Sequence, residues 1–273
     1  MFNHLLYLDR NFYRTFAANE IVDVGMDLQI RSGNLSVRIA SSDEIKDVIS
    51  LRTAVFAREY KRQIIALKSD LDRYDRNARH LIVKDESTNK VVAGYRLIEG
   101  QSVDQYYSSS EFDLAQLMAF SGKKLELSKA VVHRNYRTGK TLQLLWKGLL
   151  KYAEYRRIDF LFGIPSVQTT CQQEANSILD WFRSNGHFSE SIAEPHREFK
   201  TPGKLRLNYS EVSEVIPSLL KVYLKSGARI VSGPAIDLKY KCTDYLMVLP
   251  LDQLGEKFRN KFQSRSGPLV VNG

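Results

Sequence analysis

Residues 125–149 read LELSKAVVHRNYRTGKTLQLLWKGL, and this stretch decides the fold. Residues 125–132 are predicted to form a strand, and a helix is predicted over 141–155. The polar residues of that helix recur every three or four positions, which places them on one narrow stripe and predicts that the rest of its surface is buried. They are Gln143, Lys147, Lys151 and Glu154. A short apolar strand over 158–165 follows, so the stretch predicts a strand–loop–helix–strand crossover.

Outward from this unit, the hydrophobic pattern continues to predict strands and helices. Strands are predicted over 35–40, 80–85, 90–99, 228–233 and 244–250, and helices over 43–60, 174–182 and 217–225. Residues 86–89, Glu-Ser-Thr-Asn, separate two of the strands and predict a hairpin. Residues 184–210 show few periodic signals and are predicted to be a long loop or insertion. The fold class is therefore α+β, with a mixed central sheet flanked by helices.

The length of 273 residues suits one large domain with small appendages. Residues 1–34 are expected to be an amphipathic N-terminal extension, residues 35–254 the folded domain, and residues 255–273 a basic flexible tail. The sequence shows neither the pattern of a signal peptide nor the ~18 apolar residues that span a bilayer. We expect a cytoplasmic protein, with a peripheral contact of the extension on the inner membrane as the alternative to plain packing.

The charge balance is basic, because 40 lysines and arginines against 31 aspartates and glutamates give a net charge of +9. The excess is spread along the chain and favours acidic partners: nucleic acid, anionic lipid, a phosphorylated cofactor or an acidic carrier protein. Nucleic acid is not expected, since basic residues neither cluster in long runs nor interleave with aromatic residues. The two cysteines, Cys171 and Cys242, match no metal-ligand spacing, so no metal site is expected.

The segment between the strand and the helix carries Arg134, Arg137, Thr138, Gly139 and Lys140. The first N–H groups of a helix have no partner within the helix, and the helix dipole is positive there, so a helix N-terminus binds phosphate. Three cations strengthen this preference, and a solvated basic turn is the alternative. A nucleoside-triphosphatase P-loop is excluded, because it needs a glycine where Arg134 stands.

Five blocks of the chain resemble, in order, the ornithine–acyl carrier protein N-acyltransferase family, which is related to the acyl-homoserine lactone synthases. The blocks are LDRYDRNARHLIV (71–83), VVAGYRLI (91–98), YYSSSEFDL (106–114), residues 125–149 and residues 216–254. The resemblance implies a GNAT-like fold. It also implies transfer of a long, 3-hydroxylated acyl chain from a carrier-protein thioester to the amine of an amino acid, the first step of ornithine-lipid synthesis.

Two other functions stay open at this point. One is an enzyme of the same chemistry, an N-acyl amino acid or acyl-homoserine lactone-type signal synthase. The other is a non-catalytic basic protein that associates with a membrane or with nucleic acid.

The resemblance places the pantetheine arm of the donor along the strand over 125–132, with Val131 and Val132, and its phosphate on the loop over 133–140. A backbone N–H near Val131 is expected to contact the oxyanion. Ordinary acetyltransferases carry Arg/Gln-x-x-Gly-x-Gly/Ala in this loop, and the residues 137–141, Arg-Thr-Gly-Lys-Thr, depart from that pattern. The departure favours the single phosphate of an acyl carrier protein over coenzyme A, and no permanently bound cofactor is expected.

Glu126 is the first candidate for the general base or for a group that orients the amine, and a structural ion-paired glutamate is the alternative. Asp72 and Asp75 are candidates to hold an acceptor ammonium, and Arg96 to pair with a carboxylate. Each of these three fits a structural ion network equally well.

Four more acidic residues fall in the matching blocks. The roles of Glu111 and Asp113 stay open, and Asp237 and Asp244 are expected to serve structure.

Overall fold

The computed structural model describes residues 28–59, 70–200 and 212–254, and the chain divides into two compact units. Residues 1–98 and 129–155 belong to the first unit, and residues 99–128 and 156–273 to the second. The outer parts expected at the two ends, residues 1–27 and 255–273, lie outside the described residues.

The first unit is built on antiparallel strands in the order β1-β2-β3-β4, followed by the C-terminal end of β5. Their bounds are β1 (Ile30–Ser32), β2 (Leu35–Ile39), β3 (Arg79–Asp85), β4 (Lys90–Ile98) and β5 (Lys124–Val132). The hairpin predicted around residues 86–89 is confirmed by the pairing of β3 with β4.

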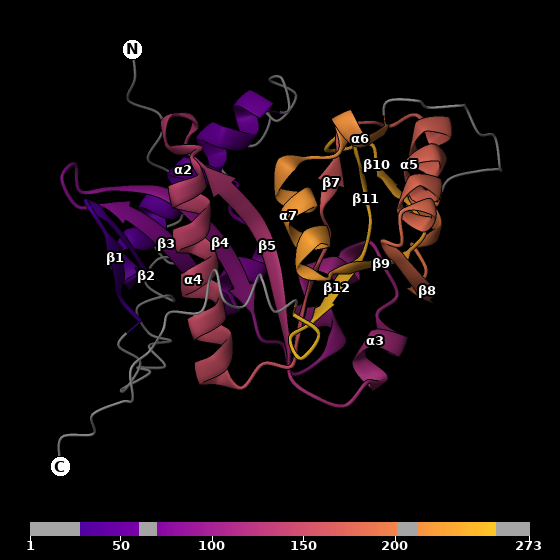
Figure 1. Cartoon of the computed structure of the whole chain (residues 1–273), viewed down its shortest axis with the longest axis horizontal. Coiled ribbons are helices and arrows are strands. Elements are labelled where there is room, and N and C mark those ends of the chain that lie inside the picture. The colour runs from indigo at the N-terminus through magenta and orange to yellow at the C-terminus, as the bar shows by residue number, and fades with distance from the viewer. Residues whose placement is uncertain (1–27, 60–69, 201–211, 255–273) are drawn as a thin grey trace. The chain divides into compact units, whose positions relative to one another are not determined.

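Two long helices belong to this unit. Helix α2 (Ile45–Glu59) follows a 3-10 turn, Ser42–Glu44, whose start is fixed by a capping box between Ser41 and Glu44. Helix α4 (Gly139–Arg156) is buried along most of its length, as the narrow polar stripe predicted, and Figure 1 shows it in front of the strands.

Helices α2 and α4 pack on opposite faces of these strands. Neighbouring residues of a strand point to opposite faces, so Leu81 and Ile82 of β3 mark the two sides. Val48 of α2 belongs to the core cluster of Ile82. Gly148 of α4 lies against Val37 and Leu81, close enough that a Cβ there would stand 2.6 Å from Val37 Cγ2. The first unit is therefore a helix–sheet–helix sandwich.

The second unit contains the N-terminal part of β5 and then, in sheet order, β6, β12, β9 and β8. The bounds are β6 (Phe160–Gly163), β12 (Met247–Pro250), β9 (Arg229–Ser232) and β8 (Phe188–Ala193). Strands β5 and β6 pair in parallel, which confirms the crossover through α4, while β12 pairs antiparallel with both neighbours. The mixed sheet of an α+β fold is thereby confirmed.

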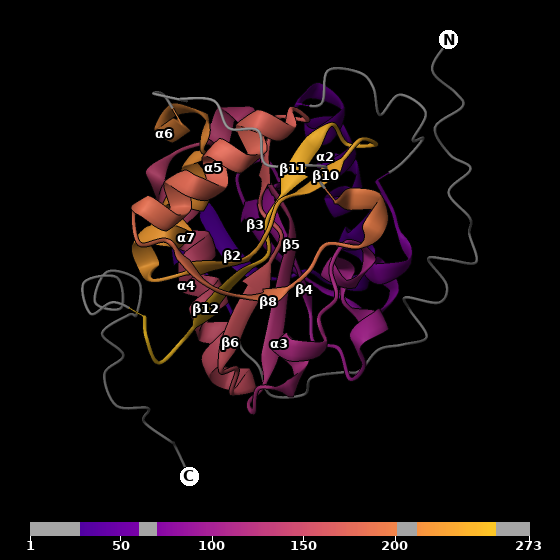
Figure 2. The ribbon, with the colours of Figure 1, turned by 90° about the vertical axis from the view of Figure 1, so that its right-hand side faces the viewer.

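A smaller three-stranded sheet completes the second unit, in the order β10-β11-β7. Its strands are β10 (Ala235–Asp237), β11 (Cys242–Asp244) and β7 (Ser166–Val167), and Figure 2 shows β10 and β11 side by side. The helices of this unit are α3 (Ala115–Ala119), α5 (Gln172–Ser184), α6 (Val212–Val215) and α7 (Ser218–Ser226). Gly227 ends α7 with a φ of 111°, a left-handed conformation that favours glycine.

Two sequence predictions were wrong in this unit. The loop predicted over 184–210 contains β8, whose middle residues 189–191 are exposed and polar and so hide the strand pattern. The single strand predicted over 244–250 is two strands in different sheets, β11 and β12, because the chain changes sheet at Tyr245 and Leu246. Both residues are fully buried, so the hydrophobic pattern shows no boundary there.

Short 3-10 turns connect several elements: η3 (Arg73–Asn77), η4 (Val103–Gln105), η5 (Tyr107–Ser110), η6 (Arg134–Tyr136) and η7 (Arg197–Phe199). Among the described residues, no helix has the length and apolar character needed to cross a membrane.

Candidate active site

Strand β5 is irregular where the donor is expected to lie. It pairs with β6 only over Lys124–Glu126, although it continues to Val132. Lys129, in the middle of the strand, has a φ of 51°, which is strained for a residue with a side chain. The backbones of β5 and β6 are also in close approach at Gly163, where a Cβ would collide with the carbonyl oxygen of Leu127. These features interrupt the regular ladder of β5.

The loop after β5 is fixed in place by backbone and side-chain hydrogen bonds. His133 N donates to Val92 O at 2.8 Å, and Tyr136 Oη donates to Asp85 Oδ2 at 2.7 Å. Thr138 Oγ1 accepts from Thr141 N at 3.3 Å, as a helix N-cap does, so α4 begins directly at this loop.

The three cations of this loop are exposed, and within the described ranges only Arg137 forms an ion pair. Arg137 pairs with Glu59 and donates from Nε to Val132 O at 3.2 Å. Within the described part of the chain, Arg134 and Lys140 form no ion pair. Next to them, a Cβ on Gly139 would meet nothing within 4 Å. The start of α4 therefore offers two uncompensated cations and an open backbone, which suits a phosphate.

A buried ion network in the first unit contains three of the predicted site residues, Asp72, Asp75 and Arg96. Arg96 Nη1 lies 2.5 Å from Asp72 Oδ1 and 3.3 Å from Asp75 Oδ1. The two aspartates also form a capping box that starts η3. The structure thus brings Arg96 together with Asp72 and Asp75, which lie on another segment of the sequence.

The network is completed by side chains that the sequence analysis did not single out. Arg52 Nη1 lies 2.6 Å from Asp75 Oδ1, and its Nη2 lies 2.6 Å from Asp70 Oδ2. Lys129 Nζ lies 3.1 Å from Asp70 Oδ1 and 3.8 Å from Asp72 Oδ2. Burial lowers the pKa of Lys129, against the attraction of Asp70. Because three cations face three carboxylates, the chain compensates Asp72 and Asp75 with its own charges.

Glu126 is completely buried in the second unit, and its carboxylate holds the turn η5. Its Oε1 accepts from Ser108 N at 2.6 Å and also from the Ser108 hydroxyl, and its Oε2 accepts from Tyr107 N at 2.6 Å. A carboxylate with this many donors is fixed in orientation. The next residue after η5 is Glu111.

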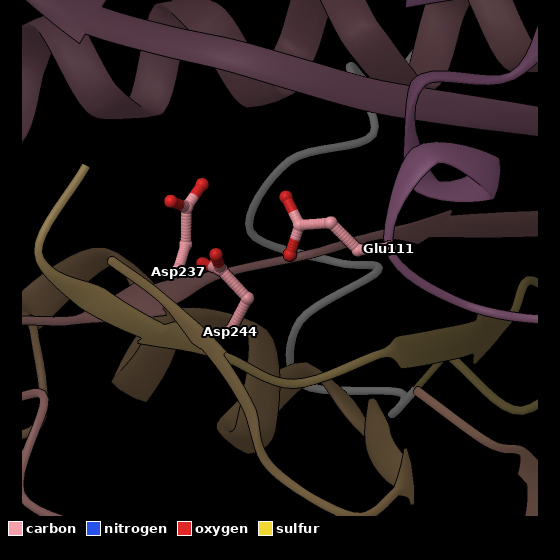
Figure 3. A group of neighbouring side chains, drawn as sticks. All are labelled: Glu111, Asp237 and Asp244. Carbon is pink, nitrogen blue, oxygen red and sulfur yellow. The ribbon is translucent and has the colours of Figure 1, made fainter. Parts of the chain in front are cut away.

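Glu111 lies in a second acidic group, with Asp237 and Asp244, all three buried (Figure 3). Their carboxylate oxygens lie within 4.8 Å of one another. Burial raises the pKa of Asp244 to about 6; hydrogen bonds to Ser166 and Glu111 oppose this rise, and the charge of Asp237 adds to it. Among the described residues this is the one group of acidic side chains whose oxygens lie close enough together to hold a metal ion.

No spacing in the sequence reveals this second group. Glu111 follows a 3-10 turn, whereas Asp237 and Asp244 come from β10 and β11 more than a hundred positions later. Their only signal was their place in the blocks that resemble the acyltransferase family, where two of them were expected to serve structure. Asp113, beside Glu111, is exposed and accepts a hydrogen bond from Ala115 N at 2.9 Å, as a turn residue does.

Comparison with known proteins shows which family has these features. A relative from Agrobacterium fabrum named L-ornithine N(alpha)-acyltransferase is 33% identical over 249 residues, which cover 84% of this chain and 85% of the relative. This chain belongs to that family. A relative of the same name from Rhizobium meliloti is 30% identical over 261 residues, 88% of each chain. The model of the acetyltransferase (GNAT) domain matches residues 51–147 of this acyltransferase.

Among solved structures, an N-acyl amino acid synthase from uncultured soil microbes covers 83% of this chain and 95% of its own, with 11% identity and a TM-score of 0.48. The GNAT-like fold predicted from the sequence is confirmed by the domain match. The chain is an N-acyltransferase, and its donor is an acyl thioester.

Proposed function

We propose that this acyltransferase transfers a long acyl chain from the phosphopantetheine thioester of an acyl carrier protein to the α-amine of ornithine. The acceptor is supported by the names of the relatives, which are L-ornithine N(alpha)-acyltransferases. In the reaction the amine nitrogen attacks the thioester carbonyl, the C–N bond forms, the C–S bond breaks, and the carrier thiol leaves with a proton. The product is an N-acylated amino acid, a precursor of aminolipids.

The observation that carries the donor proposal is the exposed basic loop at the start of α4. Arg134 and Lys140 have no ion pair among the described residues, and they flank the first N–H groups of an 18-residue helix. One phosphate on a pantetheine arm fits this arrangement, because a pyrophosphate would need more glycine backbone than Gly139 alone provides. The net charge of +9 also suits an acidic carrier protein. Coenzyme A is the competing donor.

The remaining steps are assigned to groups on β5 and beside it. A backbone N–H near Val131 would stabilise the oxyanion, with Val132 beside the pantetheine arm. Glu126 as the base, or as a group that orients the amine, stays a prediction. Its three hydrogen bonds to the turn η5 support a further role for it, that of a residue that positions this turn. Asp72, Asp75 and Arg96 would shape the acceptor site through the ion network rather than as free charges.

The test is a reaction with purified full-length protein, followed by mass spectrometry. Three donors are each tested with ornithine. They are a carrier protein with a 3-hydroxyacyl chain, a carrier protein with the same chain lacking the hydroxyl group, and coenzyme A with the 3-hydroxyacyl chain. The expected result is an N-acylornithine formed fastest from the 3-hydroxyacyl carrier protein. Equal or faster transfer from coenzyme A would overturn the donor proposal, and the absence of any acylornithine would overturn the acceptor proposal.

A further inference from the structure

The turn η6, which carries Arg134 toward the start of α4, is joined to the β3–β4 hairpin by the side chain of Tyr136. Tyr136 Oη donates to Asp85 Oδ2 at 2.7 Å, and the side chain of Thr88 also hydrogen-bonds to Tyr136. Asp85 ends β3 and Thr88 lies in the turn after it, so both partners belong to this hairpin. All of these residues lie in the first unit. One hydroxyl group thus connects two segments that are 51 positions apart in the chain.

The acceptor of this hydrogen bond is itself held in place. Asp85 Oδ1 accepts from Ser87 N at 3.0 Å and from Ser87 Oγ at 2.6 Å, while Oδ2 is the oxygen that meets Tyr136. The backbone of Asp85 pairs with Leu35 of β2 and with Lys90 of β4, and the residue is 8% exposed. A hydrogen bond to such an oriented carboxylate is stronger and more directional than one between neutral groups.

Tyr136 lies between the two cations of the loop that form no ion pair among the described residues, Arg134 and Lys140. Its backbone also shapes the loop, because its N–H donates to His133 O at 2.8 Å and its carbonyl accepts from Thr138 N at 2.8 Å. Its ring meets the ring of His133 edge to face, with 5.7 Å between the centroids. The position of Tyr136 therefore determines the course of the backbone from His133 to the first turn of α4.

We propose that Tyr136 is a positioning residue for the donor: through Asp85 it holds Arg134 and the start of α4 in the arrangement that receives the phosphate of the phosphopantetheine arm. The inference rests on the proposed function, because it takes the phosphate to bind at this loop. Asp85 has the same sign of charge as a phosphate, so it can support donor binding only by fixing the loop.

A preformed loop matters because both cations are exposed. Fixing an exposed arginine or lysine side chain on a ligand costs conformational entropy. If the backbone of the loop also had to be ordered at each binding event, that entropy would add to the cost. The hydrogen bond of Tyr136 is formed before the donor arrives, so we expect it to act on the KM of the donor rather than on the chemical step.

The experiment removes only the hydroxyl group, in Tyr136→Phe, and compares two donors with the same acyl chain. One donor is the acyl carrier protein. The other is the acyl thioester of N-acetylcysteamine, a short thiol that resembles the end of the pantetheine arm and has no phosphate. With the carrier protein, the variant is expected to raise the KM of the donor ~3- to 10-fold, with kcat and the KM of ornithine unchanged. With the short thioester, the variant is expected to match the wild type.

Three further variants make the comparison specific. Asp85→Ala removes the acceptor of the hydrogen bond instead of its donor and should give the same selective effect. Arg134→Ala should also raise the KM of the carrier protein and leave the short thioester unaffected. Tyr155→Phe changes an exposed tyrosine near the end of α4 and is the matched control, so it should behave as the wild type with both donors.

An unchanged KM of the carrier protein in Tyr136→Phe would overturn the inference. An equal loss with both donors would overturn it as well, because the hydroxyl would then support the fold in general. If Arg134→Ala keeps the wild-type KM, the placement of the phosphate on this loop is wrong, and the inference is wrong with it.

A binding measurement keeps the inference separate from the proposed acceptor. If no acylornithine forms, the proposed reaction is wrong, and the affinity for the carrier protein is then compared with and without its phosphopantetheine arm. Tyr136→Phe is expected to lower the affinity for the carrier with the arm ~3- to 10-fold and to leave the affinity for the carrier without it unchanged. Equal affinities of the variant and the wild type for the carrier with the arm would overturn the inference.

Discussion

The carboxylate of Glu126 accepts the backbone N–H of Ser108 at 2.6 Å, deep inside the second unit. The neighbouring N–H of Tyr107 binds the other oxygen, so the strand β5 and the turn η5 are joined by one side chain. The turn leads directly into Glu111. Glu126 therefore sets the position of Glu111, which lies with Asp237 and Asp244, and its influence on activity does not require it to touch the substrate.

Replacing Glu126 by glutamine tests this role. The amide has only one acceptor oxygen, so its NH2 group would face a backbone N–H, and we expect a loss of about 1.5–3 kcal/mol in the free energy of unfolding. Turnover is expected to fall while carrier-protein binding remains. The pH profile of kcat/KM separates the two roles considered for Glu126: a positioning residue leaves its shape unchanged, whereas loss of the acidic limb would show that Glu126 is the base.

The basic loop gives a second prediction. Arg134→Ala and Lys140→Ala are each expected to weaken acyl-carrier binding ~3- to 10-fold at low salt, because an exposed charge acts weakly and is screened. The two variants should also show a shallower dependence of the dissociation constant on salt. Lys46→Ala, an exposed cation of α2, is the control. Fluorescence anisotropy with a labelled carrier protein measures the dissociation constant. Unchanged affinity in a variant that combines Arg134→Ala with Lys140→Ala would contradict the placement of the phosphate on this loop.

The arrangement of the donor loop was accessible from the sequence, because it lies between two strongly patterned elements. The loop lies between the strand predicted over 125–132 and the helix predicted over 141–155, so it must lead into the N-terminus of that helix. The sequence pattern does not show which cations of the loop form ion pairs with the protein. Arg137 pairs with Glu59, far away in sequence, whereas Arg134 is left exposed.

The group of Glu111, Asp237 and Asp244 could not be predicted from the sequence, because the second sheet brings the two aspartates together and Glu111 joins them from a distant turn. The strand β10 was not predicted at all, and β11 was merged with β12 into one strand. Three-residue strands are too short for alternation to separate them from a loop. The sequence therefore predicted no neighbours for Asp237 and Asp244. In the structure Asp237 pairs with Cys242, and Asp244 is two residues from Cys242, so the two aspartates lie on one face of the second sheet.

Gly148 offers a prediction about the packing of α4. Alanine raises helix propensity by up to about 1 kcal/mol, but its Cβ would stand 2.6 Å from Val37 Cγ2, and overpacking costs about 1–3 kcal/mol. The steric cost is expected to win, so Gly148→Ala should lower the free energy of unfolding in urea titration. Gly139→Ala, at the first residue of the same helix with open space around its Cβ, should not lower it. Equal stabilities of the two variants would show that α4 shifts freely over β2.

His80 gives the last prediction, through the pH dependence of stability. It is fully buried in the ion network, its Nε2 is 3.7 Å from Asp75 Oδ1, and burial lowers its pKa to about 3, with Arg52 and Arg96 adding to the effect. Since the unfolded histidine titrates near 6.5, the unfolded state binds more protons between these values. His80 therefore removes stability as the pH falls from 6.5 toward 3, by about 1.4 kcal/mol per pH unit at most.

Asp244 acts with the opposite sign, because its pKa is raised from 3.8 to about 6. The folded state then binds the extra proton, so Asp244 adds stability as the pH falls from 6 to 3.8 and partly hides the effect of His80. Urea titrations at several pH values separate the two: His80→Leu should flatten the loss of stability on acidification, and Asp244→Asn should steepen it. If both variants keep the wild-type slope, neither group changes its proton binding on folding.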